Sequence, residues 1–330
     1  MPSANRPINT MLHLRPGDDI LPKLKEAGLP GEFIRWADAL CIGPTPSGLS
    51  ETQWRELRAR FAADNHFFPY DEALRFLSDQ DRNLMRFRDH DRVILWFEHD
   101  LFCQVNLIYL LDWFSRRDLR KTKLFLICIA KHLGHLSREK LARLFGTEHE
   151  VTAAELDLAR RAWQAFCAPD PTGLERLIDD DTTPLPFLRA ALLRHLREFP
   201  SKENGLNRTE RMAMEAVASG ESRPDRIFRA VNDREEVFWM TDGIFYPSLK
   251  RLAGGPSPLL KVNGADPWPT GNAPITGLTL GLTDTGRAVL RGEADWVKLN
   301  GIDRWLGGVH LHGAESAWRW DEENRRSIRS

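Results

Sequence analysis

The first third of the chain alternates short apolar runs with segments of helical spacing. The apolar runs are residues 11–15, 33–36, 93–97 and 123–130. The helical segments are residues 19–27, 50–65, 70–87 and 101–114. Strands that alternate with helices are typical of a parallel sheet with right-handed crossovers, and strands that are apolar on both faces lie inside a covered sheet. We therefore expect an α/β fold, with a three-layer parallel-sheet (Rossmann-like) domain over residues 1–136.

Residues 137–205 carry helical patterns only. The predicted helices are residues 137–145, 152–166, 171–178 and 186–199, with Pro and Gly between them. We expect this part to be a helical connector that packs on the first domain.

Residues 206–330 change the pattern again. Three helical segments precede two short strands, separated by a loop rich in Gly and Pro. This order is typical of a winged helix, with residues 245–252 in the position of the recognition helix. Residues 305–311 and 317–320 then predict one closing hairpin. We expect a winged-helix-like domain with a C-terminal hairpin.

Composition excludes several classes of protein. The chain has 330 residues, of which 42% are hydrophobic and 28% charged, with a formal net charge of -1. These values exclude a disordered chain or a polybasic tail. The longest apolar run has seven residues, far below the ~18 of a membrane span. No secretory signal precedes the first strand, and the four cysteines form no C-x-x-C pair. We expect a cytoplasmic protein with reduced thiols and no membrane partner.

Candidate ligand-binding residues follow the ends of the predicted strands, where open parallel sheets bind ligands. Gly17, Asp18 and Asp19 follow the first strand, and Asp38 follows the second. Neither G-x-G-x-x-G nor G-x-x-x-x-G-K-[ST] occurs, and two carboxylates would repel a phosphate. The acids suit a cation, an amine or sugar hydroxyls better. Asp19 is equally a candidate N-cap of the first helix.

The densest ionisable group is Glu98, His99 and Asp100, directly after the most apolar strand. Side chains alternate along a strand, so Glu98 and Asp100 share one side. Together with Asp18, these two carboxylates would supply oxygen ligands for Mg²⁺. Mg²⁺ is the one cofactor that the sequence suggests. His99 and Glu98 are the catalytic candidates, with His99 as general base.

The same residues have a purely structural interpretation. Asp100 can cap the following helix while Glu98 and His99 are solvated. Gln104 lies on an apolar helical face and must bind either a ligand or a neighbouring loop. His310 and His312 have metal-ligand spacing, but no third ligand is near them in the sequence, which favours simple packing.

Three motifs resemble the family known as domain of unknown function 1835: LHLRPGDD near the start, ADALCIGP from residue 37, and VILWFEHDLFCQ from residue 93. The resemblance extends to LNRTER at residue 206 and covers most of the chain. It implies one pocket, whose residues would be Gly17, Asp18, Asp38, Gly43, Glu98, His99, Asp100 and Gln104. The resemblance implies no specific activity.

Charge weakens the prediction of a DNA partner. Residues 206–330 contain 17 Lys and Arg against 17 Asp and Glu, a net charge of zero. DNA affinity depends on phosphate neutralisation, so a neutral domain needs a locally basic face. Lys250, Arg251 and Lys261 are the candidates, although Asp242 and Pro247 share the helix of the first two.

Three hypotheses remain open from the sequence. The first is a domain that binds a polar small molecule or nucleotide through Asp18, Asp38, Asp100 and Gln104, coupled to the winged-helix-like module as a regulator. The second is a magnesium-dependent hydrolase or phosphoryl-transfer enzyme. The third is a protein-interaction module without a small ligand.

Overall fold

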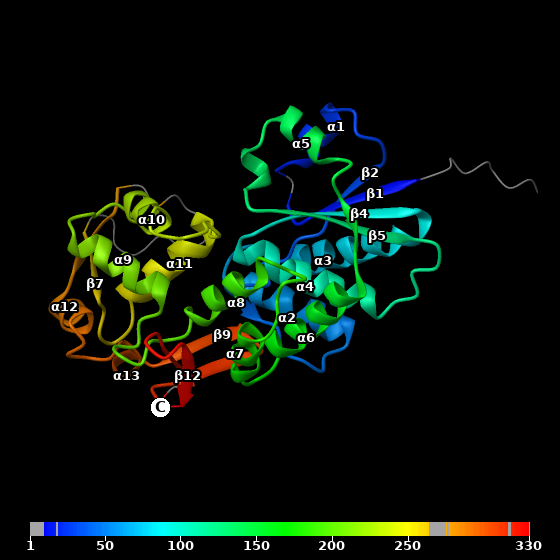
Figure 1. The fold of residues 1–330 in the computed structure, drawn as a ribbon. Helices are drawn as coiled ribbons and strands as arrows, with labels where there is room; N and C mark the ends of the chain where they lie inside the picture. Colours follow the sequence, from blue (N-terminus) through cyan, green and yellow to red (C-terminus); the bar gives the residue numbers. More distant parts are fainter. Residues whose placement is uncertain (1–9, 18, 264–274, 276, 316–317, 330) are drawn as a thin grey trace, which may run out of the picture.

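The computed structural model describes residues 10–17, 19–263, 275, 277–315 and 318–329. Its centre is a five-stranded sheet with the strand order β2-β1-β4-β5-β6 (Figure 1). The first four of these strands are parallel, and β6 is antiparallel to β5. The fold is therefore mixed α/β with a parallel sheet, as the alternating pattern predicts. The strands are β1 (Met11–Arg15), β2 (Glu32–Arg35), β4 (Arg92–Glu98), β5 (Lys123–Ile129) and β6 (His149–Glu150).

Helices cover both faces of this sheet. Leu95 and Phe97 of β4 belong to the large core that contains α4 and α6. Ile94 and Trp96 point to the opposite face and pack with Leu24 of α1 and with α5. Figure 1 shows α1 and α5 on one side of the sheet and α3, α4 and α6 on the other. Both faces are buried, which is why β4 is apolar from Val93 to Phe97. The helices are α1 (Leu21–Glu26), α2 (Glu51–Asp64), α3 (Tyr70–Leu84), α4 (Leu101–Ser115), α5 (Arg138–Leu144) and α6 (Ala153–Phe166).

Two predicted helix starts have different outcomes. Ser50 caps α2, and its side chain and that of Gln53 form the predicted capping box. The prediction that Asp19 caps the first helix was wrong, because α1 begins at Leu21 after Ile20 and has no side-chain cap. The Asp19 carboxylate accepts hydrogen bonds from Arg15 instead, at 3.1 and 3.2 Å.

The middle of the chain is helical, as expected, with the addition of the two-residue strand β6. Helix α4 packs against both α6 and α8, so these helices extend the layer on one face of the sheet, whereas α5 covers the other face. None of the helices in the described part of the chain is long and apolar enough to cross a membrane. The remaining helices of this part are α7 (Thr172–Asp179) and α8 (Leu188–Leu196).

The C-terminal part begins with three helices and an antiparallel strand pair, in the order that the sequence predicts. In Figure 1 this part lies beside the sheet and its helices, and α8 lies between them. Its elements are α9 (Arg208–Ala218), α10 (Pro224–Asn232), α11 (Asp242–Ala253), β7 (Leu260–Asn263), β8 (Thr279–Leu282), α12 (Asp284–Leu290) and α13 (Trp296–Asn300).

The last strands form two hairpins rather than the single closing hairpin that we predicted. Strand β9 pairs with β10, and β11 pairs with β12. The chain reverses at Gly307, whose φ of +63° favours glycine, inside the run that we predicted as one strand. β9 also pairs with β3 (Gly43–Pro44), which joins the C-terminal part to the N-terminal third. The strands are β9 (Ile302–Gly307), β10 (Val309–Gly313), β11 (Trp318–Asp321) and β12 (Arg326–Arg329).

Candidate functional site

A cavity of about 770 Å³ lies at the carboxyl ends of β1, β2 and β4. This is the edge of a parallel sheet at which ligands commonly bind. Residues 238–241, which lead into α11, line the opposite side. The C-terminal part therefore contributes to the walls as well as the N-terminal third. The polar lining residues are Arg15, Asp19, Asp38, Arg58, Glu98, Asp100, His132, His135 and Thr241. The aromatic ones are Phe61, Phe67, Phe68, Phe76, Phe102, Phe238 and Trp239.

A buried ion pair joins two neighbouring strands at the polar end. Arg15 is the last residue of β1, Glu98 is the last residue of β4, and these strands are hydrogen-bonded neighbours. The Arg15 Nη2 atom lies 2.8 Å from Glu98 Oε1, and both side chains are almost fully buried. Arg15 also donates to the carboxylate of Asp19. One guanidinium therefore pairs with two carboxylates at the edge of the cavity.

Glu98 stays ionised although it is buried. Burial alone would raise its pKa, but the nearby His132 imidazole, with Nδ1 3.8 Å from Glu98 Oε1, and the charge of Arg15 lower the pKa to about 2. The backbone N–H of Leu133 donates to the same carboxylate. The Glu98 carboxylate in turn raises the pKa of His132. These contacts fix the side chains of Arg15 and Glu98 and hold residues 132–133 against the end of β4.

Asp100 plays a different part. It caps α4, because its carboxylate accepts a 3.0 Å hydrogen bond from the backbone N–H of Cys103. The side chain is 4% exposed and lines the cavity, and burial raises its pKa. Unlike Glu98, Asp100 accepts no hydrogen bond from a basic side chain of the described residues. Asp100 is thus the carboxyl group of this edge that a ligand can still engage.

The arrangement does not favour Mg²⁺ at Glu98 and Asp100. One ligand atom each of Glu98, Asp100 and Cys103 lies within 4.8 Å of the others. However, Arg15 already supplies the positive charge beside Glu98. Burial raises the pKa of Cys103 well above its ordinary value, so the thiol is protonated. A divalent cation would have to displace a buried guanidinium.

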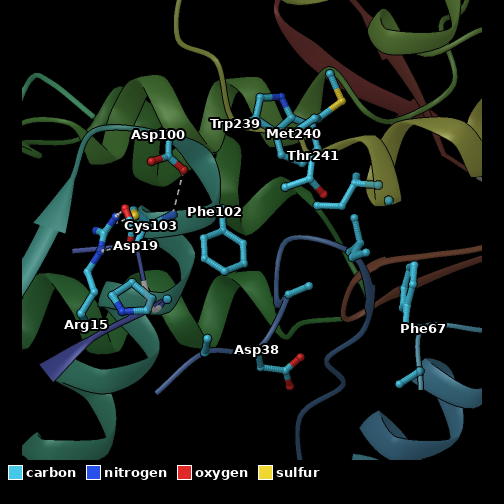
Figure 2. A pocket seen from close by; sticks show the side chains of 18 of the residues that line it. Arg15, Asp19, Asp38, Phe67, Asp100, Phe102, Cys103, Trp239, Met240 and Thr241 are labelled. Atoms are coloured by element: carbon cyan, nitrogen blue, oxygen red, sulfur yellow. Dashed lines mark hydrogen bonds and ion pairs between the residues drawn. The ribbon is translucent and has the colours of Figure 1, made fainter. Parts of the chain in front are cut away.

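Asp38 also lines the cavity, and in Figure 2 the ring of Phe102 lies between it and Asp100. Arg58 of α2 holds its carboxylate with two bonds of 2.6 and 2.9 Å and also donates to the carbonyl of Ala39. Asn106 of α4 donates to the Asp38 carbonyl at 3.0 Å. The Asp38 side chain is therefore neutralised, and it helps to shape the wall of the cavity.

The rest of the cavity is aromatic. In Figure 2 the ring of Phe102 lies between the Arg15–Asp19 group and the segment that carries Trp239 and Met240. Trp239 is 6% exposed, and its indole N–H has no acceptor within the part of the chain that the structure describes. A buried donor without a partner is costly to the folded state.

The structure brings together four of the predicted pocket residues, Gly17, Asp38, Glu98 and Asp100, around this cavity. Asp18 lies outside the described residues. The other predicted residues do not line the cavity.

His99 contacts the rings of His132 and Phe187. Burial lowers the pKa of His99, and its Nδ1 has no hydrogen-bond partner among the residues described. Gln104 donates to the Glu98 carbonyl at 2.8 Å and so fastens the end of β4. At Gly43, any Cβ atom would lie 2.6 Å from the Phe61 ring, so this glycine serves close packing.

The proposed nucleic-acid residues lie elsewhere. Lys250 and Arg251 are exposed on α11 and line a second cavity, of about 820 Å³, against the end of α2 and β9. Lys261 is exposed on β7. Glu210 accepts a bond from Arg251 at 3.2 Å, which reduces the basic character of this face.

Sequence reasoning missed several residues of the site. Arg15 could have been predicted as a site residue, because a charged side chain inside an apolar strand requires a buried partner. Asn106 carried the same kind of signal, because it is an amide inside the apolar helix α4. Arg58 did not, since α2 is of mixed composition. The segment of Phe238 and Trp239 reaches the cavity only through tertiary packing.

No family model matches the chain, and no curated protein matches it significantly.

Proposed function

We propose that the chain binds a polar small molecule with a flat ring, of the nucleoside or nucleotide class, in the cavity at the sheet edge. The observation that carries this proposal is the division of one cavity into a charged end and an aromatic end. Ligand pockets combine apolar walls with a few placed polar groups in this way, and their volumes are commonly about 300–1,000 Å³. The parallel sheet and the resemblance to domain of unknown function 1835 are consistent with a Rossmann-like domain.

The chemistry of the two ends defines the expected pose. A flat ring fits among Phe102, Phe67 and Phe76, where aromatic stacking stabilises it by about 0.5–1.5 kcal/mol per pair. Sugar hydroxyls fit Asp100, whose carboxyl accepts or donates according to its protonation.

The cavity also supports a role in regulation. Thr241, Gly243 and Ile244, at the start of α11, line it together with residues of β1 and α4. A ligand would therefore contact the helix that occupies the recognition position of the winged-helix-like module. Ligand binding would bias how this module sits against the sheet.

The proposal is tested by thermal unfolding of the full chain with a panel of ribonucleosides and their monophosphates. A ligand that binds only the folded state raises Tm by mass action. We expect at least one member to raise Tm with saturation, and Asp100→Asn to weaken its binding at least tenfold. Asp284→Asn, an exposed acid at the start of α12, is the matched control and binds like wild type. No shift across the panel, or an unchanged affinity in Asp100→Asn, would refute the proposal.

A further inference from the structure

Three potential metal ligands share one face of the C-terminal ribbon, far from the cavity in sequence. Asp303 lies on β9, and His310 and His312 lie on β10. The register places His312 directly opposite Asp303 and His310 opposite Trp305. Residues two apart on a strand, and residues directly opposite each other on paired strands, share a face. The fold thus supplies the third ligand that the sequence near His310 and His312 lacks.

The side chains are already gathered. His310 Nε2 lies 2.7 Å from Asp303 Oδ1, and His312 Nδ1 lies 3.7 Å from Asp303 Oδ2. Ligand atoms bonded to zinc at about 2.0–2.1 Å with tetrahedral angles are about 3.3 Å apart. The observed separations lie on either side of that value, and all three side chains are more than one-third exposed, so small rotations suffice.

The ring of His310 is held in place by a neighbour. Trp305 stacks on it with ring centroids 4.4 Å apart and an interplanar angle of 2°. The β9 strand that carries Asp303 and Trp305 is paired on both edges, with β10 and with β3. The backbone that carries the three ligands is therefore fixed in a sheet, and the side chains need only rotate to bind a metal.

We propose that Asp303, His310 and His312 form a binding site for a borderline transition-metal ion, Zn²⁺ being the best fit. Two imidazole nitrogens and one carboxylate oxygen are a donor set that zinc accepts, with a fourth position left for water. Asp303 also lines the cavity between α11 and β9, so this open position would lie at its rim. Mg²⁺ and Ca²⁺ are poor candidates, because they prefer oxygen ligands.

The test is equilibrium dialysis of the full, tag-free chain against micromolar Zn²⁺, followed by elemental analysis. We expect one zinc ion per chain in the wild type and none in the variant that combines His310→Ala and His312→Ala. The matched control is His149→Gln, which removes an exposed imidazole that pairs with a single carboxylate, Glu155. It keeps its zinc.

Circular dichroism shows whether the double variant is folded, which we expect since both side chains are exposed. Co²⁺ titration gives a second readout, because a tetrahedral Co²⁺ ion has intense visible bands that an adventitious aquo ion lacks. These bands appear in the wild type and are absent from Asp303→Asn. A wild type that takes up no zinc would overturn the proposal, as would a double variant that retains it.

Discussion

The buried ion pair between Arg15 and Glu98 allows a test of whether the role of Glu98 is structural rather than catalytic or metal-binding. In Glu98→Gln the guanidinium of Arg15 keeps only the exposed carboxylate of Asp19 as an anionic partner. The amide also presents an N–H₂ group where the carboxylate accepts a hydrogen bond from the Leu133 N–H and faces the imidazole of His132. Removal of one partner from a buried ion pair usually costs about 3–5 kcal/mol.

The pKa gives a second measure of the same contribution. Lowering the pKa of Glu98 from 4.5 to about 2 corresponds to about 3 kcal/mol of stability. A carboxyl group whose pKa is lowered by folding contributes fully above its unfolded pKa. Its contribution then disappears as the pH falls from about 4.5 towards 2. The variant should therefore differ from wild type at neutral pH and approach it in acid.

Urea unfolding, followed by tryptophan fluorescence at pH 7 and pH 3, measures this difference. We expect a loss of about 3 kcal/mol in the free energy of unfolding at pH 7 and a clearly smaller loss at pH 3. Glu32→Gln is the matched control, because it breaks a half-exposed pair with Arg86 and should cost less than about 1 kcal/mol. Equal losses at both pH values, or a neutral effect at pH 7, would refute this reasoning.

Three further predictions follow from the buried groups. Millimolar Mg²⁺ should leave Tm unchanged, because Arg15 supplies the positive charge beside Glu98; a rise of several degrees would contradict this. Thiol reagents should modify the native chain far more slowly than the urea-unfolded chain, because burial raises the pKa of the thiols Cys41, Cys103, Cys128 and Cys167. Glu198→Gln should cost about 3–5 kcal/mol in calorimetric unfolding, since Glu198 is buried and accepts from Arg194 at 2.8 Å and Arg304 at 2.7 Å; a cost below 1 kcal/mol would show that the pairs are dispensable.

Local pattern was sufficient for most elements of the fold. The run from Val93 to Phe97 is apolar on both faces because helices cover both, so its place in the sheet could be predicted. The parallel order then placed Asp38 and Asp100 at one edge. The two C-terminal hairpins could not be predicted, because a reversal at Gly307 depends on packing against Phe166 as well as on local preference.

The site was predicted only in outline. Strand ends identify which residues share an edge, but they do not say which carboxylates have partners. Arg15 and Arg58 come from different elements, and each neutralises a carboxylate that the sequence left as a candidate ligand. Asp100 is distinguished only by its surroundings. The wall that contains Trp239 comes from tertiary packing across more than a hundred residues.

Isothermal titration calorimetry with the panel nucleotide that gives the largest thermal shift is the most direct test of the binding cavity. Phe102→Ala removes the ring in the middle of the cavity, whereas Phe187→Ala removes a partly buried ring that contacts His99 outside it. The cavity account predicts one site per chain, at least tenfold weaker binding in Phe102→Ala and unchanged binding in Phe187→Ala. Equal affinities in both variants would contradict it.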